Sequence, residues 1–138
     1  MKNLLILIAV LLLAAAAYYI YDTFRERTYP EKVGEIIYFE DQRVLSPELT
    51  KYLENDDPDL RARAALAVGR IGAPGSGKLL YEVMTSDSSM DVAAQAAFAI
   101  GLTGEKKYTA DLLDLALDLP SKVTVRLVEA AGRLTDTS

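Results

Sequence analysis

Residues 60–69 read LRARAALAVG, and this stretch decides the fold of the chain. Alanine has the highest intrinsic helix propensity, and leucine and arginine follow it closely. Three residues just before the stretch favour a helix start: Asp57 as the cap, Pro58 at the first helical position, and Asp59 as a negative charge near the positive end of the helix dipole. The sequence therefore predicts a helix over residues 58–71.

The same pattern returns twice. Residues 92–101 read VAAQAAFAIG and residues 123–132 read VTVRLVEAAG, so the pattern closes on a glycine at positions 69, 101 and 132, at nearly equal spacing. We expect each stretch to end near its glycine, as helices often do, and Ser89 and Ser121 to cap the second and third stretches. A period of roughly 30 residues is typical of stacked helix pairs. The larger side chains expected on the buried face are Leu60 and Leu66, Val92 and Phe98, and Val123 and Val128.

A shorter amphipathic segment precedes each alanine-rich stretch, bounded by Gly, Pro and Ser residues. An additional helix near residues 31–43 is expected to pack on the first pair as a cap. No segment shows the alternation of a strand. We therefore predict an all-α fold, a short α-solenoid of about three helix pairs: 46–54 with 58–71, 77–85 with 90–102, and 109–117 with 121–134.

This pattern resembles HEAT repeats, particularly the short bacterial variety, whose second helix reads Val-Arg-x-x-Ala-Ala-x-Ala-Leu-Gly after an Asp-Pro turn. Residues 60–69 match it almost position by position, with Arg61 in the arginine position. The second and third stretches have Ala93 and Thr124 there instead. The resemblance covers roughly residues 35–134. It implies a scaffold fold, which many unrelated functions share.

A narrower likeness involves residues 35–43, EIIYFEDQR, followed by the repeats. This order is similar to the leading part of bacterial exported proteins in which HEAT-like repeats precede a cyclophilin-type prolyl isomerase domain. The likeness implies a role in recruiting peptides or proteins, and it assigns no catalytic residue to this chain.

Residues 1–27 are expected to form a membrane anchor. No charged residue occurs from residue 4 to residue 21, and 18 helical residues span about 27 Å, close to the thickness of a bilayer's hydrocarbon core. Residues 28–45 then form a linker and capping helix, and residues 46–138 the repeat domain. The residues expected to hold the anchor in the lipid bilayer are Leu4, Leu5, Leu7, Ile8, Leu11, Leu12, Tyr18, Tyr19 and Tyr21.

A cleaved signal peptide is the alternative, because Lys2 precedes an apolar stretch and Ala15 to Ala17 satisfy the cleavage rule. The apolar run continues through Tyr21, which favours a retained anchor over both a signal peptide and a buried core helix. Arg25 and Arg27 beyond the run favour a cytoplasmic domain, whereas the signal-like start favours export. We expect a single-pass protein of the bacterial inner membrane with its C-terminal domain in the periplasm.

Composition excludes several functions. The chain has no Cys and no His, so it has no thiolate chemistry, no disulfide and no zinc site built from these residues. Beyond residue 27 the chain has 12 Lys and Arg against 18 Asp and Glu, and such an acidic surface repels nucleic acid.

Residues 72–78, GAPGSGK, follow the phosphate-loop spacing, but Leu79 replaces the metal-binding Ser or Thr and a helix precedes the loop. We expect no enzyme activity, nucleotide, metal or cofactor.

Polar residues on the second helix of each pair are the candidates for binding a partner, because these helices line the concave side of HEAT-like solenoids. The alternative for Arg61 is that it ties adjacent repeats together. The candidate residues are Arg61, Arg70, Gln95, Arg126 and Arg133.

Two functions remain at this point. The first is an accessory subunit that packs on a larger membrane protein complex, for which a respiratory or photosynthetic assembly is a reasonable host. It is favoured because helical arrays expose apolar surface at uncapped ends, which we expect other protein subunits to cover. The alternative is the peptide- or protein-recruiting arm of an exported folding factor related to cyclophilin-type prolyl isomerases.

Overall fold

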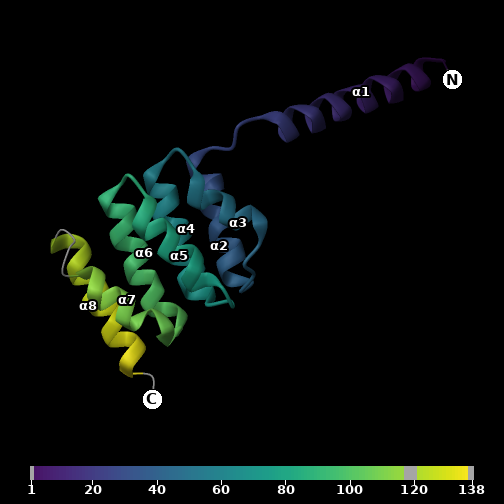
Figure 1. Cartoon of the computed structure of the whole chain (residues 1–138). Coiled ribbons are helices and arrows are strands. Elements are labelled where there is room, and N and C mark those ends of the chain that lie inside the picture. Colours follow the sequence, from purple (N-terminus) through teal and green to yellow (C-terminus); the bar gives the residue numbers. More distant parts are fainter. Residues whose placement is uncertain (1, 117–120, 137–138) are drawn as a thin grey trace.

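The computed structural model describes residues 2–116 and 121–136, and all regular elements in these residues are helical (Figure 1). This confirms the all-α prediction. The elements are α1 (Lys2–Phe24), α2 (Tyr29–Asp41), α3 (Pro47–Lys51), η1 (Tyr52–Glu54), α4 (Pro58–Ile71), α5 (Ser76–Ser86), α6 (Met90–Thr103), η2 (Lys106–Tyr108), α7 (Thr109–Ala116) and α8 (Ser121–Asp136).

The helices after α2 form three stacked pairs: α3 and η1 with α4, α5 with α6, and α7 with α8. Helix α6 packs against both α4 and α8, and α2 packs on α4 at the start of the array, as the sequence predicted (Figure 1). The helix limits agree with the predicted segments to within about two residues. Leu117, the predicted end of the fifth repeat helix, lies outside the described residues.

Local chemistry explains where the repeat helices start and end. The Asp57 carboxylate accepts a hydrogen bond from the Asp59 backbone N–H at 2.9 Å, so the predicted cap of α4 is present. Ser89 is the N-cap residue of α6, as predicted, but its hydroxyl accepts no capping hydrogen bond. Asp87 instead accepts from the Ser89 backbone N–H at 2.8 Å, from a position just before it in the chain. Helices α4 and α6 end at Gly72 and Gly104, whose φ angles of 60° and 73° are left-handed.

The glycines that close the repeated pattern lie inside their helices and do not terminate them. A Cβ at Gly69 would lie 2.6 Å from the Ala99 backbone oxygen, and one at Gly101 would lie 2.6 Å from the Ala130 Cα. Only glycine allows so close an approach of the next second helix. These two contacts bring consecutive second helices together.

The sequence analysis predicts two core residues on each second helix. The first of the two is buried in all three helices, and the second is not fully buried in any of them. Leu60, Val92 and Val123 are buried. Phe98 is half-buried, as is Leu66, and Val128 is 54 % exposed. Val128 is exposed because it lies on the side of α8 that faces away from α6, where the described chain places no further helix pair.

Helix α1 stands apart from the stacked pairs (Figure 1). It has 23 residues, none of them buried, and an 18-residue window with a mean hydropathy of 2.5. Helix α1 is long enough and apolar enough to cross a membrane, and a signal sequence can have the same length and composition.

Candidate functional site

The second helices of the three pairs form the closely packed side of the array. Helix α6 lies against α4 and α8, whereas α5 has no comparable packing against α3 or α7. The second helices α4, α6 and α8 are therefore the more closely packed layer of the array, here called the inner helices. The candidate partner-binding residues all belong to these inner helices.

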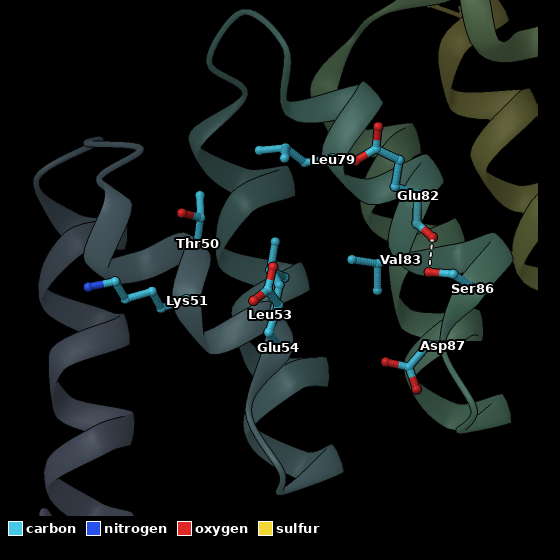
Figure 2. Close-up of a pocket in the computed structure, with 9 residues that line it drawn as sticks. All are labelled: Thr50, Lys51, Leu53, Glu54, Leu79, Glu82, Val83, Ser86 and Asp87. Carbon is cyan, nitrogen blue, oxygen red and sulfur yellow. Dashed lines mark hydrogen bonds between the residues drawn. The ribbon is translucent and has the colours of Figure 1, made fainter.

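A groove opens between the spread first helices of pairs one and two (Figure 2). Leu53 of η1 and Val83 of α5 are on its two walls, and the volume is about 350 Å³. The Ser86 hydroxyl at its edge donates to the Glu82 backbone oxygen at 2.7 Å. The groove combines apolar walls with a largely acidic rim; its lining residues are Thr50, Lys51, Leu53, Glu54, Leu79, Glu82, Val83, Ser86 and Asp87.

Arg61 joins the first pair to the second. Its guanidinium donates to both carboxylate oxygens of Asp87, at 2.7 and 2.9 Å, and to the backbone oxygen of Asn55 at 2.8 Å. The side chains of Arg61 and Asp87 are only 14 % and 7 % exposed. The hydrogen bond from Arg61 lowers the pKa of Asp87 below its ordinary value, despite partial burial. This is the geometry expected of an arginine that ties adjacent repeats together.

Arg70 joins α4 to the capping helix α2. It donates to one Glu40 oxygen at 2.7 Å while Arg63 donates to the other at 2.5 Å, and Arg43 donates to the Arg70 backbone oxygen at 2.9 Å. Burial raises the pKa of Glu40, but the bonds from Arg70 and Arg63 outweigh it, so the pKa lies below its ordinary value. The Arg70 side chain remains half exposed, beside a polar cavity of about 530 Å³.

Arg126 and Arg133 point back toward the preceding pair. Both guanidinium groups lie over the ring of Phe98 on α6, at 5.2 and 5.0 Å from its centroid. Arg126 also pairs with Glu129 at 2.9 Å. Gln95 is half-buried on α6, one turn before Phe98. The structure therefore brings Arg126 and Arg133 to the junction of α6 and α8, whereas Arg61 and Arg70 are held by Asp87 and Glu40.

The sequence analysis expects apolar surface at an uncapped end of the array without naming its residues, and the structure places such a face on the last pair. Leu113, Val125 and Val128 are 47 %, 58 % and 54 % exposed. Among the described residues, nothing lies within 4 Å of where a Gly132 Cβ would be. Aligning the repeats would have revealed this face. When Gly101 is aligned with Gly132, the positions that match the two valines are alanines 94 and 97, which are buried.

Stacked helix pairs with a repeated close contact between their second helices define an α-solenoid, a class that offers extended surfaces to other proteins. A family model described as HEAT repeats matches residues 46–132. The chain therefore belongs to the HEAT repeat family, whose members generally act as non-enzymatic scaffolds in protein–protein interactions. A search of the curated proteins found no match to the chain.

Proposed function

We propose that this protein is a membrane-anchored HEAT-repeat scaffold, an accessory subunit that packs on a larger membrane protein complex. In this proposal residues 1–27 are the anchor, 28–45 the linker and capping helix, and 46–138 the scaffold. One observation carries it: α1 is a long apolar helix with none of its residues buried, and a short segment connects it to a HEAT-repeat array.

The hydrophobic effect favours a bilayer around α1. Exposing apolar surface to water costs about 25 cal/mol per Å², and large apolar side chains cover α1 on every side. Its 23 residues extend about 34 Å, enough for a hydrocarbon core of about 30 Å. Tyr18, Tyr19 and Tyr21 cluster at the end nearest the repeats, where an aromatic belt would meet the bilayer surface.

The segment after α1 is held by ion pairs, which supports a scaffold kept close to the bilayer. Arg25 pairs with Asp22 at 3.0 Å and with Glu31 at 2.5 Å, joining the end of α1 to the start of α2. The hydrogen bond from Arg25, with further bonds from Thr28, lowers the pKa of Glu31 to about 2. Arg27 pairs with Glu35, which also accepts the Tyr52 hydroxyl at 2.5 Å.

The anchor is tested by fractionating native membranes and washing them with alkaline carbonate. We expect the chain to remain in the pellet with its N-terminus at Met1, and Leu11→Arg to reduce insertion because an arginine near the bilayer centre costs about 3 kcal/mol. Leu11→Ile is the matched control. A mature form that begins after Ala17, or release by carbonate, contradicts the anchor.

Association is tested by native electrophoresis after solubilisation in mild detergent. A subunit of a larger complex migrates far above the 15.1 kDa of the chain, whereas a lone monomer contradicts the proposal. Protease accessibility in intact spheroplasts then tests the sidedness, for which we propose the periplasm of a bacterial cell because of the signal-like N-terminus.

The groove of Figure 2 favours a second candidate, the peptide-recruiting arm of an exported folding factor. Its apolar walls and acidic rim suit a basic, partly apolar peptide. A further domain of about 150 residues encoded after residue 138 would support this candidate over the first.

A further inference from the structure

Each second helix of the array carries Ala-x-Gly at the same position: residues 67–69 in α4, 99–101 in α6 and 130–132 in α8. In α6, Ala99 meets Gly69 of the preceding second helix and Gly101 meets Ala130 of the following one. Residues two apart in a helix lie roughly 160° apart around its axis. Each second helix therefore has an inserting side at its alanine and, nearly opposite, a receiving side at its glycine.

The receiving side of α8 has no occupant within the described chain. No atom of residues 2–116 and 121–136 lies within 4 Å of a Cβ built on Gly132, and Val125 and Val128 on the same side are more than half exposed. At the matching positions of α6, Ala94 and Ala97 are 5 % and 0 % exposed, because the third pair packs there.

The first helix of the last pair shows the same vacancy. Tyr81 of α5 contacts the following unit by stacking on Tyr108, with 5.8 Å between ring centroids. When the predicted first helices 77–85 and 109–117 are aligned, Tyr81 matches Leu113 of α7, which is 47 % exposed. The exposed large apolar side chains described in the last pair thus occupy positions through which the preceding unit contacts its neighbour. We call Leu113, Val125, Val128 and Gly132 the end face.

The other end of the array shows why a second copy of this chain does not fit the end face. The inserting alanine of the first pair, Ala67, is fully buried, and α2 packs on α4. Arg63 and Arg70 hold α2 in place through Glu40. A copy stacked head to tail would have to displace this capping helix and break both ion pairs.

We propose that the end face docks a helix pair of a different protein, a subunit of the complex assigned under the proposed function, on which this inference rests. The second helix of that pair runs beside α8 as α8 runs beside α6. It presents alanine or an equally small residue to Gly132 and apolar side chains to Val125, Val128 and Leu113. The contact continues the stacking that already joins α4 to α6 and α6 to α8.

The test places a photo-crosslinking amino acid at Val128 of the full chain in native membranes, with a second version at exposed Glu82 of α5. We expect a cross-link from position 128 that maps, by mass spectrometry, to a helical segment of another protein, and none to that segment from position 82. The change Gly132→Leu should reduce this product at least tenfold. It adds a side chain in open space, so the chain folds, but it fills the receiving side.

Gly34→Leu is the matched control, because Gly34 also lies on the exposed side of a helix, and no described atom lies within 4 Å of its Cβ position. It should leave the cross-link unchanged. A cross-link to a second copy of the chain, or to a further helix pair encoded after residue 138 of this chain, overturns the inference. An unchanged yield in Gly132→Leu while the large complex persists overturns it as well. If the unmodified chain is found in no large complex, the proposed function is overturned instead. Failure of the docking inference and failure of the proposed function are therefore distinguishable.

Discussion

Gly101 and Gly132 occupy the same position in consecutive helix pairs and have opposite surroundings. A Cβ on Gly101 would lie 2.6 Å from the Cα of Ala130, whereas a Cβ on Gly132 would meet nothing within 4 Å. Both glycines close the same Ala-x-Gly pattern. In a repeat protein the sequence of one unit determines which contact that unit can make with the next. Whether the contact forms depends on the presence of the neighbouring unit.

The largest effect is expected from Gly101→Ala. The added methyl group meets backbone atoms of α8 that cannot move aside without separating the helices, so we expect the free energy of unfolding to fall by about 3 kcal/mol. The melting temperature, followed by circular dichroism of the repeat domain, should drop by about 10 °C or more. An unchanged melting temperature would show that α8 does not approach α6 as closely as described.

A smaller effect is the difference in the free energy of unfolding between Arg61→Ala and Arg126→Ala. The sequence analysis makes both arginines candidates for binding a partner. Arg61→Ala leaves the Asp87 carboxylate partly buried without its bidentate partner, and we expect a loss of about 2 kcal/mol. Arg126→Ala removes an exposed ion pair and one contact with Phe98, so we expect less than about 1 kcal/mol. Denaturant unfolding of the two variants measures this difference. Equal losses would argue against Arg61 as the link between pairs.

The same link predicts a dependence of stability on pH. The pKa of Asp87 is lowered in the folded chain by its hydrogen bond from Arg61, so this group stabilises the fold above its unfolded pKa. That contribution is lost as the pH falls from about 4 through the folded pKa. We expect Asp87→Asn to lower stability at neutral pH and to flatten the acid slope of unfolding, measured from about pH 5 to pH 3. A slope identical to that of the unmodified chain would contradict this assignment.

How much the sequence predicted depends on whether a feature is local. The helices, the Asp57 cap and the capping helix over α4 follow from propensity and spacing, and the structure confirms them. Ser89 occupies the N-cap position of α6, but its hydroxyl makes no capping hydrogen bond. Asp87, which is held by the distant Arg61, accepts a hydrogen bond from the Ser89 backbone N–H. The apolar pattern places Val128 in the core, but burial of this side chain requires a helix that the described chain does not place there.

The candidate partner-binding residues stay a prediction, but their contacts within the chain could not be read from the sequence. The sequence selects Arg61 and Arg70 by their place on the second helices, and the structure shows that both are engaged with carboxylates elsewhere in the chain. Which carboxylate an arginine reaches depends on tertiary distances that spacing alone does not give. The end face could have been found from the sequence, since valines replace buried alanines there.

The smallest expected effect, and of opposite sign, is that of Gly132→Ala. Glycine inside a helix costs about 1 kcal/mol relative to alanine, and here no close contact offsets this cost. The substitution should therefore raise the free energy of unfolding of the isolated chain by about 0.5–1 kcal/mol, and its melting temperature by a few degrees. Gly34→Ala, in similarly open space on α2, should behave alike and provides the control. If Gly132→Ala lowers stability and Gly34→Ala does not, part of this chain already covers the end face. If Gly132→Ala raises stability and weakens the docking of the partner helix pair, the glycine serves a contact that is made only in the complex.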